Sequence, residues 1–202
     1  MSAPSPRRAR PGGRSARVKS SVIEATLSAL VADGYAALSV ADVAHRAGVH
    51  ETSIYRRWGT KAALASEACL SSAASAIRVP ETGSLRRDLR ALVAQVIRFL
   101  GSDVGRALLG VAMQTFDQAS DVAQLRTEFW SRRFGAANMI FDRARQRGEL
   151  SAGVDAGALL ELVIAPLYFR AAISGEPLSL RRAYRQIDMA LGLLPAASGR
   201  GT

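Results

Sequence analysis

The short segment from His50 to Trp58 carries side chains that could recognise a nucleic acid. A helix turns by about 100° per residue, which places Ile54 and Trp58 on one apolar stripe. The side chains that then face outward are Thr52, Ser53, Tyr55 and Arg56. Arginine reads guanine in the major groove, and hydroxyl groups contact bases or phosphates. The spacing therefore predicts a helix that packs on a core through its apolar stripe and presents its polar side to a DNA duplex.

Two basic residues, Arg57 and Lys61, follow at the far end of this predicted reading helix. They are better placed for the phosphate backbone than for base edges. The free amide groups at the start of the next helix, near Thr60, also suit a phosphate. We therefore expect this end of the segment to bind the DNA backbone.

The residues before the reading helix predict the elements that position it. An apolar helical pattern runs from residue 17 to a stop at 33–34. Ser39 then precedes a second short helix, with Asp42 in its first turn, as an N-terminal cap does. A tight turn at residues 47–49 leads into the reading helix. Three short helices joined in this way form a helix-turn-helix.

The remainder of the chain predicts long helices separated by Gly, Pro and Ser residues. Their expected ranges are roughly 60–77, 85–100, 104–117, 121–147, 155–174 and 179–194. No stretch alternates with a period of two, so we expect no strands. The predicted fold is all-α. Its expected parts are a disordered basic arm (1–16), a helix-turn-helix DNA-binding domain (17–62), a ligand-binding and dimerisation domain of bundled helices (63–195) and a flexible tail (196–202).

Composition narrows the class of protein. The 202 residues include 27 Lys and Arg against 17 Asp and Glu, a net charge of +10 that favours polyanionic partners. Hydrophobic residues make up 49%, enough for a packed core. The single cysteine, Cys69, excludes an intrachain disulfide, and the two histidines, His45 and His50, are too few for a Cys/His metal cage. We expect no metal and no cofactor.

The expected location is the cytoplasm. No apolar run approaches the roughly 18 residues of a membrane span. A polar stretch at 10–14 follows the Arg7-Arg8 pair where a twin-arginine signal would need apolar residues. The Arg-rich arm itself is either a solvated tail or a contact to the minor groove.

These motifs resemble the DNA-binding domain of the TetR family of transcriptional regulators, over about residues 17–65. The resemblance lies in the runs SVADVAHRAGV at 39–49 and SIYRRWGTKAAL at 53–64. It implies that Tyr55 and Lys61 contact phosphates and that Ser39 caps its helix and can touch the DNA backbone. It also implies that the sequence is read by Thr52, Ser53 and Arg56.

The chain departs from the family pattern at His50, Glu51 and Gly59. A carboxylate at position 51 would repel a phosphate. Glu51 therefore either accepts a hydrogen bond from a cytosine amino group or points away from the DNA.

Family members dimerise through their last two helices, and the apolar spacing here supports that arrangement. The stripe on the final helix is Leu180, Tyr184, Ile187, Leu191 and Leu194. The stripe on the preceding helix is Leu160, Val163 and Leu167, continued by Arg170 and Ile173. Two copies could join through these stripes in a four-helix interface with twofold symmetry. The alternative is that both stripes cover the chain's own core.

A regulatory pocket is expected among the helices of the second domain. The bulky apolar candidates are Phe99, Met113, Phe116, Phe129, Trp130, Phe134, Met139 and Phe169, and the polar candidates are Gln114, Asn138 and Tyr168. Each of these residues is also compatible with an ordinary core position. Together they favour an apolar effector.

The resemblance implies a homodimeric regulator, most often a repressor, that leaves its DNA when a small molecule binds. A dimer would read two half-sites of a palindromic operator, about 34–36 Å or a multiple of that apart. The alternatives are a basic protein that coats nucleic acid without regard to sequence and an all-α enzyme. Because the chain has no Walker loop, no dinucleotide-binding glycine motif and no Glu-x-x-His pair, we expect no enzymatic activity.

Overall fold

The computed structural model describes residues 13–115 and 120–194, and these residues form helices with no strand among them. The helices are α1 (Arg14–Ala37), α2 (Val40–Ala47), α3 (Glu51–Trp58), α4 (Lys61–Ala76), α5 (Leu85–Leu100), α6 (Asp103–Gln114), α7 (Ser120–Gln146), α8 (Ala156–Phe169), a π-helical turn (Arg170–Ser174) and α9 (Leu180–Gly192). The prediction of an all-α fold is confirmed.

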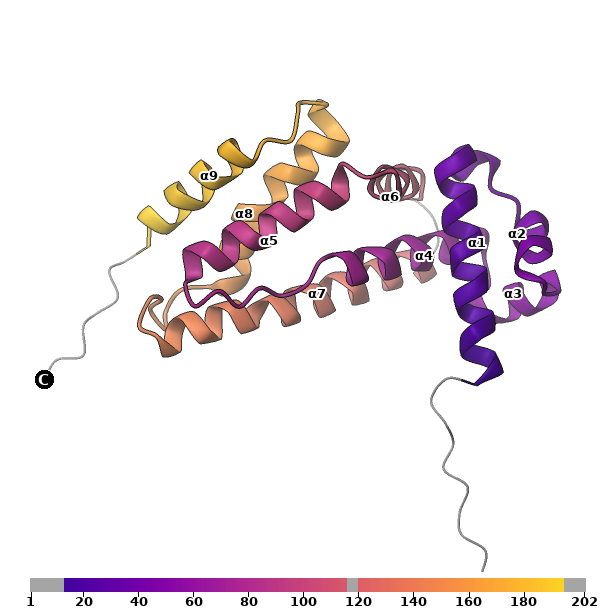
Figure 1. Ribbon diagram of the computed structural model, residues 1–202, viewed down its shortest axis with the longest axis horizontal. Helices are drawn as coiled ribbons and strands as arrows, with labels where there is room; N and C mark the ends of the chain where they lie inside the picture. Colours follow the sequence, from indigo (N-terminus) through magenta and orange to yellow (C-terminus); the bar gives the residue numbers. More distant parts are fainter. Residues whose placement is uncertain (1–12, 116–119, 195–202) are drawn as a thin grey trace, which may run out of the picture.

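The first three helices form a unit at one end of the molecule (Figure 1). Helix α1 leaves helical geometry at Gly34, where φ is 75°, and α2 ends at Gly48, where φ is 65°. Both values lie in the left-handed region that glycine adopts at little cost, so the two residues set the direction of the chain between helices. Helix α1 begins at Arg14, so residues 14–16, which we predicted as part of the arm, are helical. The rest of the predicted arm up to residue 12 and the predicted tail 196–202 lie outside the described residues.

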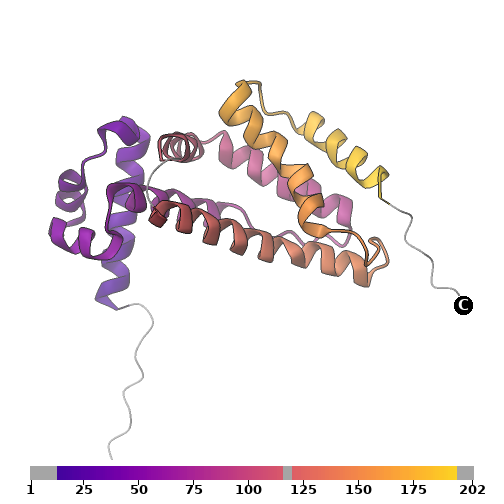
Figure 2. The ribbon, with the colours of Figure 1, turned by 180° about the vertical axis from the view of Figure 1, so that it is seen from behind.

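The second domain extends away from this unit as a bundle, seen from behind in Figure 2. Helix α5 packs against α8 and α9, and α7 runs beside α4. The largest side chains of its core are completely or almost completely buried: Leu89, Ile140, Phe141, Leu167 and Ile187. This burial of apolar surface holds helices that are distant in sequence in one block.

Helix α4 belongs to both domains. Its first half contributes Leu64, Ala65 and Cys69 to the core of the helix-turn-helix, whereas Ala73 belongs to the core of the bundle. The predicted boundary after residue 62 therefore falls inside one continuous helix. Helix α4 therefore joins the two cores directly.

The stripe predicted for dimerisation on α8 faces the chain's own core. Leu160, Val163 and Leu167 are buried there, and so is Ile187 of α9. Tyr184 and Leu191 are half-buried against the same core, and Leu180 is exposed at the start of α9. The burial of these four residues agrees with the alternative that the stripes cover the chain's own core. An interface through them stays a prediction, because apolar spacing marks a buried face without showing what buries it.

The opposite faces of the same helices are also apolar. Five large side chains are between 54% and 81% exposed there: Leu162, Phe169, Ile173, Met189 and Leu193. The segment Ala156–Ser174 has a mean hydropathy of 1.6 in its most apolar window and is only 28% buried. By length and composition alone, this is the one segment among the described residues that could cross a membrane, a feature that the search for uninterrupted apolar runs missed. A helix packed between two protein surfaces has the same apolar composition on all sides.

Candidate nucleic-acid interface and ligand cavity

Helix α3 has one buried and one open face. Ile54 is 2% exposed and Trp58 is 7% exposed, and both belong to the core that α1, α2 and α4 share. On the other side the exposed or half-exposed residues are Thr52, Ser53, Tyr55, Arg56 and Arg57. This orientation is the one that the helical spacing predicted. A helix with this open face can enter a major groove without disturbing its own packing.

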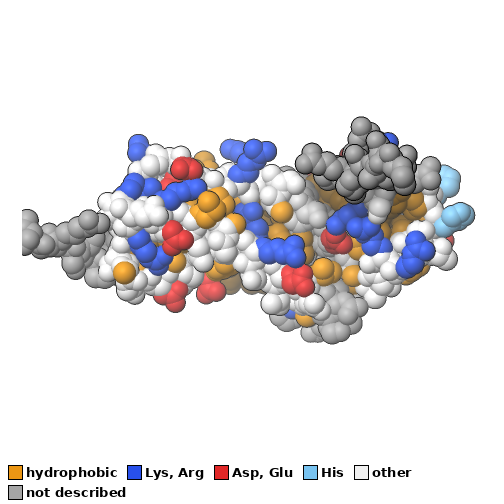
Figure 3. Space-filling model, turned by 90° about the horizontal axis from the view of Figure 1, so that it is seen from below, with side chains coloured by type: hydrophobic (Ala, Val, Ile, Leu, Met, Phe, Trp, Pro, Cys, Tyr) orange, Lys and Arg blue, Asp and Glu red, His pale blue; other side chains and the backbone are white. Residues whose placement is uncertain are grey.

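Arg56 and Arg57 lie exposed on α3, and Lys61 begins the next helix. Figure 3 shows Lys and Arg side chains, together with the histidines, at the helix-turn-helix end of the molecule. Ser53 and Arg56 of α3 line a surface groove with Val18 and Val22 of α1. Positive charge over this end attracts the phosphates of DNA regardless of sequence.

Lys61 is held in place by α1. Its Nζ donates a hydrogen bond of 3.2 Å to the carbonyl oxygen of Ala36 and lies 4.9 Å from the centre of the Tyr35 ring. An ammonium group has three donors, so Lys61 can keep this bond and still donate to a phosphate. The guanidinium of Arg57 lies 5.4 Å from the Trp58 ring centre, which restricts the exposed side chain.

Two capping hydroxyls define the helix starts next to α3. Ser39 Oγ accepts a hydrogen bond of 3.2 Å from the amide of Asp42, and Thr60 Oγ1 accepts one of 3.0 Å from the amide of Ala63. Glu51 lies exposed in the first turn of α3, where the helix dipole stabilises a carboxylate. An acid at this position favours the start of α3 whether or not it also contacts DNA.

Glu67 is a positioning residue that the sequence analysis missed. Its Oε2 accepts a hydrogen bond of 2.6 Å from the indole nitrogen of Trp58, and its Oε1 forms an ion pair of 2.5 Å with Lys19. A buried indole N–H requires an acceptor. The need of the Trp58 indole for an acceptor was therefore the signal that could have pointed to Glu67, which lies nine residues further along the chain.

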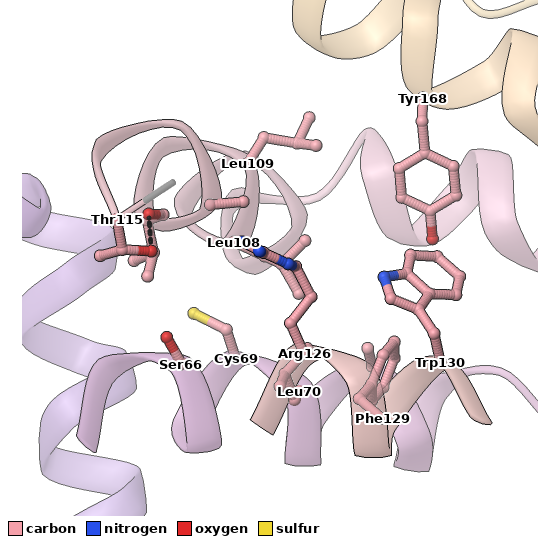
Figure 4. Close-up of a pocket in the computed structure, with 13 residues that line it drawn as sticks. Ser66, Cys69, Leu70, Leu108, Leu109, Thr115, Arg126, Phe129, Trp130 and Tyr168 are labelled. Carbon is pink, nitrogen blue, oxygen red and sulfur yellow. Dashed lines mark hydrogen bonds between the residues drawn. The ribbon is translucent and has the colours of Figure 1, made fainter. Parts of the chain in front are cut away.

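A cavity of about 110 Å³ lies between α4, α6, α7 and α8 (Figure 4). We call it the central cavity. The residues that line it are Ser66, Cys69, Leu70, Ala73, Leu108, Leu109, Val111, Ala112, Thr115, Arg126, Phe129, Trp130 and Tyr168. A smaller cavity of about 30 Å³ on the other side of Phe129, Trp130 and Tyr168 is lined by Phe134 and Arg133, among others. The three shared aromatic rings form the wall between the two cavities.

The predicted pocket residues divide into three groups. Trp130, Phe129 and Tyr168 line the central cavity, and Phe134 lines the smaller one. Phe99 is buried in the core of the bundle. The other described candidates are exposed and line neither cavity: Met113, Gln114, Asn138, Met139 and Phe169. Phe116 lies outside the described residues. The exposed candidates differ from the prediction because bulk alone does not show which side of a helix faces inward.

The described part of the chain offers no metal site. No group of three or more His, Cys, Asp and Glu side chains in it could hold an ion. His45 and His50 are exposed on the helix-turn-helix. Burial raises the pKa of the Cys69 thiol to about 12, so this wall residue of the central cavity is protonated at neutral pH.

Comparison with known proteins agrees with these two parts. Residues 22–68 match the family model described as bacterial regulatory proteins, tetR family, and residues 79–190 match the model of the tetracyclin repressor-like C-terminal domain. The chain is 34% identical to the HTH-type transcriptional regulator AqdR of Rhodococcus erythropolis over 70% of this chain and 68% of that protein. It is 30% identical to the HTH-type regulator YdeS of Bacillus subtilis over 77% of this chain and 78% of the relative. The crystal structure of the TetR family transcription regulator SCO0332 superposes with a TM-score of 0.76 at 25% identity, covering 89% of this chain and 100% of that one.

Proposed function

The chain belongs to the TetR family of DNA-binding transcriptional regulators, and we propose that it is a homodimeric repressor that a small molecule releases from a palindromic operator. Its relatives are regulators and not enzymes. The observation that carries the proposal is the open face of α3. From this face Thr52, Ser53 and Arg56 read the bases of the major groove. The flanking phosphates are bound by Ser39, Tyr55, Arg57 and Lys61. The protein acts in the cytoplasm, where its DNA lies.

The second copy packs on the outward face of α8 and α9. Five large apolar side chains are exposed there, and an apolar patch of this kind on a protein in water usually marks an interface. A twofold axis through this face would make the interface self-complementary and give the dimer two equivalent α3 helices. Two reading helices can then occupy two half-sites of one operator.

The effector binds in the central cavity. Ser66, Cys69 and Leu70 of α4 form one wall, and Glu67 on the same turn holds Trp58 of α3. A ligand that displaces this part of α4 therefore changes the position of α3. The ligand can release the operator only if it binds more tightly to the conformation that does not fit the DNA than to the conformation that does.

Selection of duplexes from a random library with the purified protein, followed by sequencing, tests the proposal. We expect inverted half-sites and binding to the selected duplex that is roughly 10³-fold tighter than to a scrambled one at the same salt concentration. If the scrambled duplex competes equally well, the protein is a sequence-indifferent nucleic-acid-binding protein and the proposal fails.

A further inference from the structure

The charge on the wall of the central cavity has one sign. Among its described lining residues there is no Asp or Glu, and the charged side chain is Arg126. Arg133 lies half-buried about two turns further along α7, in the smaller cavity beside Tyr168. Burial lowers the pKa of Arg133, although an arginine begins far enough above neutrality to stay charged. The charged side chain among the described lining residues of the central cavity is thus a cation, which favours an anionic group on a ligand.

The polar hydrogens at the cavity come from α7 and α8. Arg126 and Trp130 are four residues apart, so their side chains share one face of α7. Figure 4 shows the indole nitrogen on the side of the Trp130 ring nearest Arg126. Burial raises the pKa of Tyr168 to about 12, so its hydroxyl remains a donor at neutral pH. No hydrogen bond joins the Trp130 indole or the Tyr168 hydroxyl to another described residue. A ligand with an oxygen atom could accept hydrogen bonds from the Trp130 indole and the Tyr168 hydroxyl.

Arg126 has a partner within the chain. A guanidinium carries five N–H donors in a planar fork, so it can bind a carboxylate in addition to that partner.

The rest of the wall is apolar and limits the size of the ligand. Leu70, Ala73, Leu108, Leu109, Val111 and Phe129 provide it. Because a buried cavity of about 150 Å³ holds benzene, a partly open cavity of 110 Å³ suits a body of about one ring. A longer ligand would have to move the wall of Phe129, Trp130 and Tyr168.

We propose that the effector of the central cavity is a small apolar monocarboxylate, about the size of benzoate, whose carboxylate lies against Arg126 and the Trp130 indole nitrogen. The proposal names the chemical class of the effector and so rests on the regulatory function proposed above. The positive charge of Arg126 disfavours a cationic apolar molecule of the same shape.

Three planar probes of nearly identical shape test the charge. Benzoate, benzamide and benzamidinium carry charges of −1, 0 and +1, and their affinities are measured by calorimetry on the full-length protein without DNA. We expect benzoate to bind about tenfold more tightly than benzamide, and benzamidinium to bind most weakly. If benzamide or benzamidinium equals benzoate, or if benzoate does not bind, the proposal is overturned.

Two variants locate the contact. Arg126→Met keeps an unbranched, flexible side chain but removes the charge and the guanidinium donors, so it should weaken benzoate binding about tenfold and change benzamide binding less than about twofold. Arg132→Met is the matched control, because Arg132 is exposed on the same helix and pairs with Glu128 outside the cavity. Equal effects of the two variants on benzoate would overturn the assignment to Arg126.

Operator binding is measured separately with and without benzoate, so the two proposals can fail independently. Selective benzoate binding without release of DNA would retain the ligand class and contradict the proposed regulation. Sequence-specific DNA binding without any binding of benzoate would retain the DNA-binding function and contradict the proposed ligand class.

Discussion

The indole nitrogen of Trp58, at the end of α3, donates a hydrogen bond of 2.6 Å to the carboxylate of Glu67 on α4. The second oxygen of the same carboxylate pairs with Lys19 of α1. One side chain thus ties three helices together, one residue away from the Ser66 wall of the central cavity. The position of the reading helix is therefore linked to the helix that a ligand would touch.

Replacing Glu67 by Gln tests this link. The amide keeps an acceptor for Trp58 and loses the charge that holds Lys19. We expect operator affinity to fall about five- to tenfold, as measured by fluorescence anisotropy. Glu128→Gln, which changes an exposed carboxylate of the neighbouring α7, should leave the affinity unchanged. Equal affinities of the Glu67 variant and the native protein would show that the link does not position α3.

Two α3 variants separate the reading of bases from the binding of phosphates. Arg56→Ala should cost about 1–3 kcal/mol on the preferred duplex and relax the preference at one base position. Tyr55→Ala should weaken all duplexes alike, because a phosphate contact carries no sequence information. Binding to a panel of single-base operator variants distinguishes the two patterns. If both variants relax the preference equally, the assigned roles are wrong.

The outward face of α8 and α9 is tested by placing a charge on it. Met189 is 69% exposed, so Met189→Glu should leave the fold intact and prevent a second copy from burying this face. Sedimentation velocity should then show a monomer. Met113→Glu is the matched control, because Met113 is 56% exposed on α6, away from that face. A dimeric Met189 variant would place the interface elsewhere.

Gly105 at the α5–α6 corner has no room for a side chain. A Cβ atom there would lie 1.9 Å from the carbonyl oxygen of Phe99. Gly105→Ala should therefore lower the free energy of unfolding by about 2–4 kcal/mol in urea denaturation. On the same helix, Gly110 faces open space, and Gly110→Ala should raise the free energy of unfolding by up to about 1 kcal/mol. Similar effects of the two substitutions would contradict the tight corner.

Cys69 provides a pH-dependent test of the cavity wall. Its pKa is raised by burial to about 12 from an ordinary value near 8.5. The folded protein should therefore resist alkylation by iodoacetamide at pH 8–9, and the thiol should react at an ordinary rate in denaturant. The sign for stability follows from the same shift. Between the unfolded and folded pKa values the unfolded chain binds fewer protons, so this group makes the free energy of unfolding fall as the pH rises. Rapid alkylation of the native protein would contradict the buried thiol.

Features that depend on local chemistry could be predicted from neighbouring residues. A 3.6-residue period gave the two faces of α3, because Ile54 and Trp58 are separated by one turn. Ser39 with Asp42 marked the start of α2, since a capping hydroxyl acts on an amide three residues away. Gly48 marked its end because few other residues accept a positive φ. These signals are contained in a few neighbouring residues, and they were enough to place the reading helix.

Which helix surfaces meet could be seen only in the folded molecule. Helix α8 is apolar on both sides, so its periodicity could not show that Leu160 and Val163 face the chain's own core while Leu162 stays exposed. The contact of Glu67 with Lys19 joins residues 48 positions apart. Arg126 enters the central cavity only because α4, α6 and α8 close around its helix. Long-range contacts of this kind depend on how whole helices pack, and no local pattern of residue types encodes that packing.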